Sequence, residues 1–302
     1  MRFRHPEPRF CRPRRLPPVS QLVGTVSALW RYPVKSMLGE AVSGPVAVGG
    51  DGIAGDRRFG VVDASTGIVA SAKRPRRWRR LLLLQARLLG EDVIRIDFPD
   101  GSSVVSTGDT LDEALSEFVG EKVELRSQAP LGAELERALP DDVFTAGPDA
   151  DVPFATLPMA LASPPGTFFD FSPLHLITSA SLARAEELHP VGRVDAVRYR
   201  PNMVIDTVAG LAGFVENDWA GRRLHLGPHV VIEALIPSPR CVIPTLAHGA
   251  LPSDFDALRV LQRHNVVTVP IAEIGPAPCL GIHAMVVAGG VVAPGDEVRL
   301  AS

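Results

Sequence analysis

The sequence predicts an α+β protein that is predominantly β, with two β-barrel units and a few helices. Apolar runs are short and separated by turn residues, with 27 glycines and 28 prolines among 302 residues, as expected for many short strands. Only about three segments have helical periodicity, and no Gly-x-Gly-x-x-Gly motif opens a strand–helix–strand unit. Because 46% of the residues are apolar, the chain can bury a sizeable core, which excludes disorder as its general state.

Composition divides the chain into four segments. A Pro-broken stretch with six arginines in its first 15 residues predicts a disordered basic tail over residues 1–19. A β-barrel unit is expected over 20–126 and a second unit over 173–302. Between them, seven prolines and no hydrophobic period predict a long connection over 127–172. Connections of this length are usually functional or disordered, so this one is expected to be partly ordered over a site.

The first unit begins with an apolar run that Tyr32 and Pro33 end. Its predicted strands cover residues 23–30, 42–48, 59–62 and 93–98. Thr110 and Glu113 have the spacing of a capping box, and apolar residues follow at helical spacing, so we expect a helix that ends near Gly120. A further strand is expected over 123–125.

The second unit begins with a short apolar run before a predicted helix. Ser179 or Ser181 can cap this helix, which continues through Leu188. Residues 254–263 have helical spacing as well. The predicted strands, of which Pro237 ends the third, cover residues 203–206, 223–226, 230–236, 283–287 and 297–300.

The distribution of charge argues against a nucleic-acid binder. Residues 1–15 and 73–80 carry 12 of the 31 cations and one of the 34 acids, which leaves 19 cations against 33 acids elsewhere. The basic segment 73–80 (KRPRRWRR) is interpreted as a solvated turn or strand edge, or as a contact for an anion or a partner. No apolar run is long enough for a membrane span, and three cysteines do not make a disulfide scaffold. A reducing cytoplasm is therefore the expected compartment.

Cys241 is the first candidate for chemistry. It follows a predicted strand and Pro237-Ser-Pro-Arg240, a place where a pocket can open. Arg240 would favour the thiolate, the form that binds metals and attacks electrophiles. The alternative is a buried apolar cysteine. Cys279 and His283 form only a weak metal pair, because two further ligands at matching spacing are absent.

Polar side chains at the ends of predicted elements are candidate anion ligands. They are Lys35, Ser36, Arg57, Thr178, Ser179, Arg200 and Asn202. The chain has only three lysines against 28 arginines, and a lysine followed by a serine at a strand end can hold a phosphate oxygen. Together these donors would make one anion-binding pocket near a thiolate. Taken singly, Lys35 is equally compatible with an exposed turn lysine, and each of the others is more often a cap or a surface charge than a ligand contact.

An ordered series of motifs resembles the MOSC family, named after the C-terminal part of molybdenum-cofactor sulfurase. WRYPVKSMLGE and GDRRFGVVD resemble its N-terminal β-barrel domain. FSPLHLITSASL, VRYRPNMVID, ENDWAGRRLHLG, PSPRCVIPT and VVAPGDEVRL resemble the MOSC domain itself. The likeness covers about residues 20–125 and 170–302. Its two-part arrangement is similar to that of the mitochondrial amidoxime-reducing component and its bacterial relatives.

The resemblance implies a molybdenum–molybdopterin cofactor whose metal is bound by Cys241. Carried over by motif, the expected cofactor contacts are Lys35, Ser36 and Arg57 at the phosphate, Thr178 and Ser179 at a helix start, Arg200 and Asn202 at the pterin, and Ser238 and Arg240 beside the metal. The family often continues its Arg-Cys motif with Thr-Thr-Val-Asp-Pro, whereas this chain has Val-Ile-Pro-Thr-Leu. We therefore expect the part of the site that faces the substrate to differ from that of other family members.

The implied activity is the reduction of N-hydroxylated or related N–O or S–O small molecules. Electrons would come from a separate ferredoxin, flavodoxin or cytochrome, because the chain has no flavin or iron–sulfur motif; the basic segment 73–80 is a candidate docking face for it. The alternative is a sulfur or cofactor carrier in which Cys241 bears a persulfide. Pyridoxal phosphate is argued against by the three lysines, none in an evident pyridoxal motif. A module that binds nucleic acid or membrane is argued against by the acidic remainder.

Overall fold

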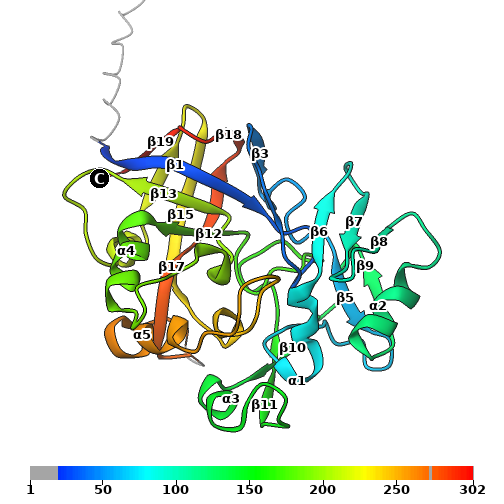
Figure 1. The fold of residues 1–302 in the computed structure, drawn as a ribbon. Coiled ribbons are helices and arrows are strands. Elements are labelled where there is room, and N and C mark those ends of the chain that lie inside the picture. The colour runs from blue at the N-terminus through cyan, green and yellow to red at the C-terminus, as the bar shows by residue number, and fades with distance from the viewer. Residues whose placement is uncertain (1–19, 272–273, 302) are drawn as a thin grey trace, which may run out of the picture.

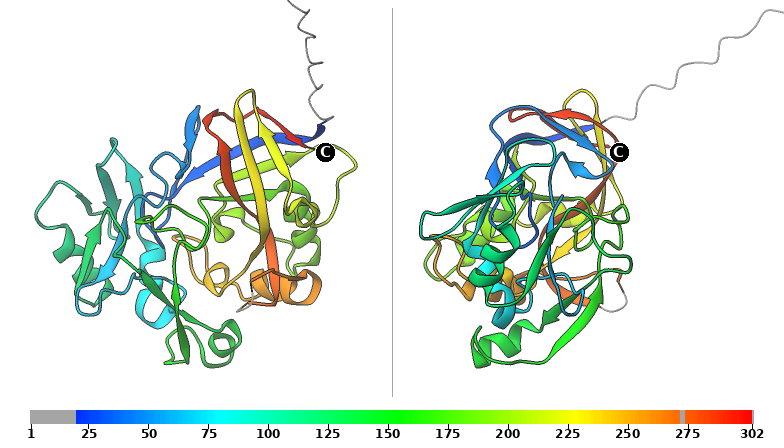
Figure 2. Two further views of the ribbon diagram at one scale, coloured as in Figure 1. Left: turned by 180° about the vertical axis from the view of Figure 1, so that it is seen from behind. Right: turned by 90° about the vertical axis from the view of Figure 1, so that its right-hand side faces the viewer.

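The computed structural model describes residues 20–271 and 274–301 of the chain. The tail expected over residues 1–19, with Cys11, therefore lies outside the described residues. Figures 1 and 2 show a larger barrel beside a smaller β unit, with a hairpin and a short helix below them. The predicted class, predominantly β with a few helices, is confirmed.

The larger unit is a closed barrel of seven strands. They are β1 (Gln21–Arg31), β12 (Leu174–Thr178), β13 (Met203–Thr207), β14 (Arg223–Leu226), β15 (Val230–Pro239), β17 (Pro276–Ala288) and β19 (Glu297–Leu300). Around the barrel the order is β12-β13-β1-β19-β14-β15-β17, and β17 pairs back with β12. The short strands β2 (Glu40–Ala41) and β16 (Val266–Thr268) extend this sheet.

The first strand crosses the boundary expected from the sequence. β1 was expected in the unit over 20–126, yet it pairs with β13 and β19 of the barrel. Val23, Val26 and Leu29 are buried in the barrel core, which is the physical reason for this placement. A small sheet of β3 (Val46–Gly49), β4 (Gly52–Ile53) and β18 (Gly290–Val292) likewise pairs strands from the early and the late part of the chain.

The smaller unit packs short strands and one helix around Trp78, which is fully buried. Its elements are β5 (Gly60–Asp63), β6 (Gln85–Leu88), β7 (Ile94–Asp97), β8 (Ser103–Val105), α2 (Leu111–Val119) and β9 (Val123–Arg126). The predicted helix is confirmed, and Gly120 ends it with a φ of 82°. The predicted cap is wrong, because the Thr110 side chain makes no capping hydrogen bond.

The basic segment 73–80 is helical, so its interpretation as a solvated turn or strand edge is wrong. It forms α1 (Pro75–Trp78), which begins with proline, and the 3₁₀ helix η1 (Arg79–Leu83). Five of its six cations pair with acids of the same chain: Lys73 with Asp170, Arg74 with Glu136, Arg76 with Asp151, Arg77 with Asp63 and Glu121, and Arg79 with Asp149. The sixth, Arg80, lies over the ring of Phe118.

The connection over 127–172 contains regular structure that the sequence pattern did not predict. It holds β10 (Glu134–Ala138), α3 (Pro140–Ala146) and β11 (Phe154–Pro158), and the two strands pair as an antiparallel hairpin. β10 alternates faces, but three of its five residues are charged. With so many charged residues, the segment lacks the alternation of apolar and polar residues on which the prediction of a strand depends.

The barrel unit has two α-helices, α4 (Ser179–Leu188) and α5 (Asp256–His264), which lie on one flank of the barrel (Figure 1). It also contains the 3₁₀ helices η2 (Ala196–Tyr199), η3 (Val215–Trp219) and η4 (Ile243–Thr245). Both predicted helices are confirmed, but Thr178 rather than Ser179 or Ser181 is the N-cap of α4. β15 also continues through Pro237, where bulges in its pairing with β17 accommodate proline. Among the described residues, no helix is long and apolar enough to cross a membrane.

Candidate functional site

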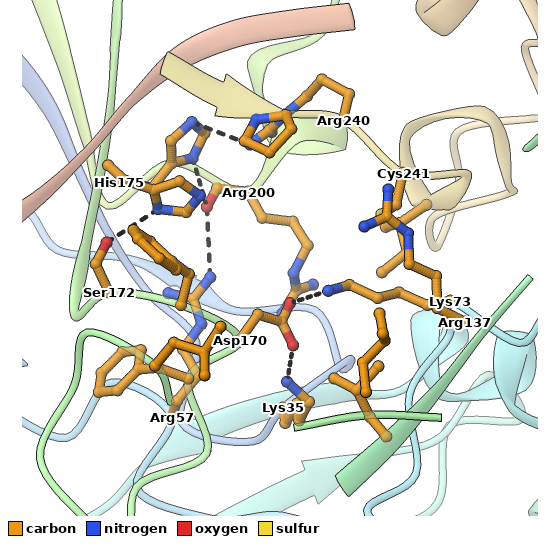
Figure 3. Close-up of a pocket in the computed structure, with 18 of the residues that line it drawn as sticks. Lys35, Arg57, Lys73, Arg137, Asp170, Ser172, His175, Arg200, Arg240 and Cys241 are labelled. Carbon is orange, nitrogen blue, oxygen red and sulfur yellow. Dashed lines mark hydrogen bonds and ion pairs between the residues drawn. The ribbon is translucent and has the colours of Figure 1, made fainter. Parts of the chain in front are cut away.

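A cavity of about 490 Å³ lies where the two units and the connection meet (Figure 3). Seven cationic side chains line it, among them Lys35, Arg57, Lys73, Arg137, Arg200 and Arg240. Asp170 is the one carboxylate among the lining residues that the structure describes. A concave site with this excess of positive charge attracts an anion, and its volume is that of a typical small-molecule site.

Strained backbone is concentrated at this cavity. Ser36, Arg57 and Arg200 have φ values of 64°, 44° and 56°, and only Ala160 shares a positive φ among the non-glycine residues of the described ranges. Side chains other than glycine rarely adopt this conformation, and residues that do so cluster at functional sites. The turns that follow β1 and β4, and the end of η2, thus aim these side chains into the cavity.

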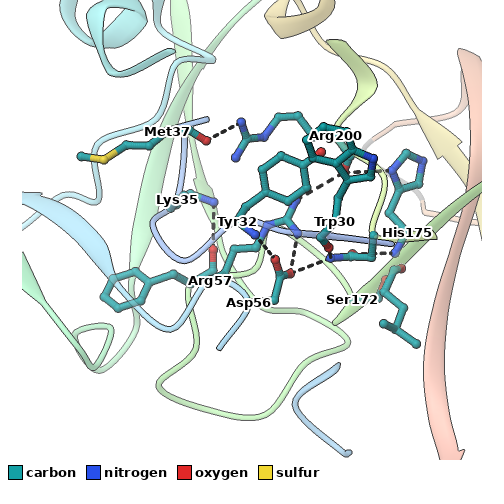
Figure 4. Close-up of polar contacts among 12 residues, drawn as sticks. Trp30, Tyr32, Lys35, Met37, Asp56, Arg57, Ser172, His175 and Arg200 are labelled. Carbon is teal, nitrogen blue, oxygen red and sulfur yellow. Dashed lines mark hydrogen bonds and ion pairs between the residues drawn. The ribbon is translucent and has the colours of Figure 1, made fainter. Parts of the chain in front are cut away.

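Two of the cations stack on opposite sides of one tyrosine (Figure 4). The guanidinium carbons of Arg57 and Arg200 lie 4.5 Å and 4.3 Å from the centre of the Tyr32 ring. Burial raises the pKa of Tyr32 to about 12, against the effect of the two arginines, so the ring is neutral. Arg200 donates through Nη1 to the carbonyl of Met37 at 2.7 Å. Its buried Nη2 has no hydrogen-bond partner among the described residues.

Asp56 connects the segment around Tyr32 and Arg57 with Asn202, which precedes β13. Its carboxylate accepts hydrogen bonds from the backbone N–H of Tyr32 at 2.7 Å and from Nδ2 of Asn202 at 2.9 Å, and it pairs with Arg57. The side-chain Oδ1 of Asn202 accepts from the backbone N–H of His175 at 3.1 Å. Asn202 lines the cavity, but its amide is therefore engaged within the protein.

Lys35 and Lys73 share one carboxylate. Asp170 pairs with both ammonium groups, and Lys73 Nζ lies 3.0 Å from Oδ2. Lys35 also donates to the carbonyl of Phe168 at 3.2 Å. Burial lowers the pKa of Lys35 to about 8, although Asp170 opposes the shift. Burial alone would raise the pKa of Asp170, but the two lysines hold it well below its usual range.

We expect the affinity of the cofactor-free protein for sulfate to fall about tenfold between about pH 7 and pH 9. Sulfate keeps its charge over this window, whereas Lys35, with a pKa of about 8, loses its proton. Calorimetric titration measures the change. Lys35→Met should bind weakly at every pH, and Lys122→Met, which changes an exposed lysine, should keep the wild-type profile. A flat wild-type profile would contradict the role of Lys35.

Cys241 lies two residues beyond the end of β15 and lines the cavity half-buried, as a free cysteine. Arg240 turns its guanidinium toward the barrel, donating to the carbonyl of Tyr199 at 2.9 Å and to the hydroxyl of Ser238. Burial lowers the pKa of Arg240, but the group remains a cation at neutral pH. Ser36 lines the same cavity, and its Oγ accepts from the backbone N–H of Ala72 at 3.1 Å.

Two buried histidines stand behind Arg240, a pair that the sequence did not predict. His175 and His283 are direct cross-strand partners on β12 and β17. His175 Nε2 lies 3.3 Å from Arg240, and His283 lies 3.0 Å from the hydroxyls of both Ser172 and Ser238. Burial lowers the pKa of His283 to about 3 and that of His175 well below its usual value. Both rings are therefore neutral. His175 contacts Arg240 directly, whereas His283 contacts Ser238, the hydroxyl that accepts a hydrogen bond from Arg240.

The spacing of Cys279 and His283 does not produce a metal pair. The Cys279 thiol donates to the carbonyl of Ala277 at 3.3 Å, and burial raises its pKa to about 11. His283 is engaged with serine hydroxyls. Across residues 20–271 and 274–301, no group of three or more histidine, cysteine or acidic side chains could hold a metal ion.

Of the ten residues that the sequence predicted for the site, the structure brings seven to the cavity. They are Lys35, Ser36, Arg57, Arg200, Asn202, Arg240 and Cys241. Ser238 is buried behind Arg240. Thr178 donates to buried Glu216 at 2.7 Å, and Ser179 donates to Asp206 at 3.0 Å, so neither hydroxyl reaches the cavity.

These features define a class of protein: a mostly β chain of two parts, with a cation-rich cavity between them and a free cysteine in its wall. Residues 23–129 match the family model of the MOSC N-terminal beta barrel domain, and residues 164–299 match that of the MOSC domain. The chain belongs to the MOSC family.

Solved structures with similarity to this chain are distant in sequence. The YuaD protein from Bacillus subtilis is 10% identical, with 94% of this chain and 99% of that chain covered and a TM-score of 0.45. YiiM from Geobacillus stearothermophilus is 16% identical, with 43% of this chain and 55% of that chain covered and a TM-score of 0.29. No curated protein matches the sequence.

Proposed function

We propose that this protein binds a molybdenum–molybdopterin cofactor in the cavity and reduces N-hydroxylated or related N–O or S–O small molecules. The MOSC family is associated with molybdenum-cofactor binding. The observation that carries the proposal is the lining of the cavity. An excess of cations, one of them with an unpartnered buried donor, faces the same space as a half-buried free cysteine.

The residues present fit the anionic end of such a cofactor. Arg200 offers the unpartnered Nη2, and a buried guanidinium in this state gains most from a phosphate oxygen. Ser36 accepts a backbone hydrogen bond, which leaves its hydroxyl proton to donate. Lys35 and Arg57 add positive charge from the same side of the site. We assign these four residues to the phosphate and pterin.

The metal end is assigned to Cys241. A thiolate is a soft ligand that suits a metal already held by sulfur. When bound, the cofactor supplies a metal that changes oxidation state during the reduction of the substrate. Arg240 stays charged and fixed beside it, because Tyr199 and Ser238 accept its hydrogen bonds. Thr178, Ser179 and Asn202 are left out of the ligand set, since their polar groups are engaged elsewhere.

The electrons for this reduction would come from a separate donor protein of the ferredoxin, flavodoxin or cytochrome type. The chain itself has no flavin or iron–sulfur motif. The basic segment 73–80 is no longer favoured as the docking face, because its ion pairs with acids of this chain take up much of its charge.

The test is the metal and pterin content of protein made in a host that synthesises the cofactor. Wild type should contain about one molybdenum per chain, and Cys241→Ala should lose the metal while keeping its circular dichroism and melting temperature. Cys279→Ala, which changes the other described cysteine, should keep the metal. Retention of the metal by Cys241→Ala would contradict the assignment. Wild type without metal but with cyanolysable sulfur would favour the persulfide carrier instead.

A further inference from the structure

The β10–β11 hairpin forms one wall of the cavity. Leu135 and Arg137 are two residues apart on β10 and share a face, and Leu157 on β11 pairs directly with Leu135. All three side chains line the cavity. Glu136 points to the opposite face, where it pairs with Arg74 at 2.6 Å. The hairpin therefore presents two leucines and one guanidinium to any molecule in the cavity.

Arg137 is the least committed cation of this lining. Lys35 and Lys73 share Asp170, and Arg200 donates to Met37. Arg137, by contrast, makes no side-chain hydrogen bond or ion pair with any described residue. A guanidinium that is half-buried without a partner gains strongly from an anionic ligand.

Arg137 lies at the cysteine end of the cavity. The next residue, Ala138, packs in the same apolar cluster as Cys241. Figure 3 draws Arg137 next to Cys241 and Lys73, with Arg57 across the cavity. The phosphate is already assigned to that other side, so Arg137 faces the space left for a substrate near the reacting centre.

We propose that Arg137 selects substrates that carry a carboxylate on an apolar body. This inference rests on the proposed function, since it concerns the substrate of the same cavity. The planar fork of arginine matches a carboxylate with two parallel hydrogen bonds. The apolar body would pack on Leu135 and Leu157 of the hairpin and on Leu161, which is 61% exposed at the cavity.

Binding of benzoate and benzamide tests the inference without any turnover. These probes have the same ring and differ in charge, and calorimetry on the purified full chain measures both. Wild type should bind benzoate more tightly than benzamide, and Arg137→Gln should weaken benzoate binding about tenfold or more while leaving benzamide unchanged. Arg137→Lys should retain part of the preference, and the exposed-strand control Arg126→Gln should retain all of it. Equal benzoate affinity in wild type and Arg137→Gln would overturn the proposal.

A kinetic arm separates this inference from the proposed function. With a chemical reductant, N-hydroxybenzamidine and its carboxylated analogue are compared on cofactor-loaded protein. Arg137→Gln should raise KM about tenfold for the carboxylated substrate only, with kcat nearly unchanged. An increase in KM for both substrates alike would count against charge selection. Absence of turnover in wild type would refute the proposed activity, whereas the benzoate titration would still decide the role of Arg137.

Discussion

Asp56→Ala is expected to lower the free energy of unfolding by about 3 kcal/mol or more, the usual cost of removing one partner of a buried ion pair. The Asp56 side chain is fully buried and accepts from a backbone N–H, an amide and a guanidinium. Alanine would leave the N–H of Tyr32 and the amide of Asn202 without their acceptor, and the cation of Arg57 without its counter-ion. Urea unfolding followed by circular dichroism measures the loss.

Two further variants make this result specific to the buried carboxylate. Asp51→Ala changes an exposed carboxylate in the same region of the chain and should alter stability by less than about 0.5 kcal/mol. Asp56→Asn keeps an acceptor for the backbone N–H and should fall between wild type and Asp56→Ala. A loss below about 1 kcal/mol in Asp56→Ala would show that this carboxylate does not hold the two parts of the site together.

Arg200→Met is expected to separate binding from stability. Sulfate affinity of the cofactor-free protein should fall about 10- to 100-fold, because a charge-assisted hydrogen bond from a buried guanidinium is lost. The free energy of unfolding should change by about 1 kcal/mol or less, because the variant also removes a buried donor without a partner. Burial, helped by the nearby Arg57, lowers the pKa of Arg200 to about 10, which reflects the cost of keeping this charge inside the protein.

Arg193→Met serves as the matched control, since the Arg193 side chain is 72% exposed. It should leave both sulfate affinity and stability unchanged. The assignment of Arg200 would be wrong if Arg200→Met bound sulfate as tightly as wild type. A large loss of stability in Arg200→Met would indicate that the stacking on Tyr32 and the bond to Met37 dominate its role.

The sequence was most informative where the local pattern decides the structure. The helix over Leu111–Val119 has apolar residues at helical spacing, and the strand over Arg223–Leu226 alternates between exposed and buried side chains. Lys35 and Cys241 could be singled out because lysine is scarce in this chain and because a cysteine follows a strand end. Their common position on one cavity depends on folding, which brings together segments about two hundred residues apart.

The site residues that the sequence did not predict depend on contacts between segments far apart in the chain. Asp170 was not predicted because its importance comes from two lysines more than ninety residues earlier in the chain. The spacing of Cys279 and His283 suggests a pair, but His283 lies opposite His175 across the sheet and contacts the hydroxyls of Ser172 and Ser238. Gly281 permits that approach, since a Cβ there would lie 2.4 Å from His175 Nε2.

The position of β1 limits how this protein can be divided. A fragment that begins at residue 173 would lack one strand of its barrel, β1. The backbone groups of β13 and β19 that now pair with β1 would then form open edges. Open edges invite pairing with other chains, so such a fragment should aggregate rather than fold. The smaller unit is thus an insertion between the first strand of the barrel and the other six. Any truncation that is meant to isolate the barrel must therefore retain Gln21–Arg31.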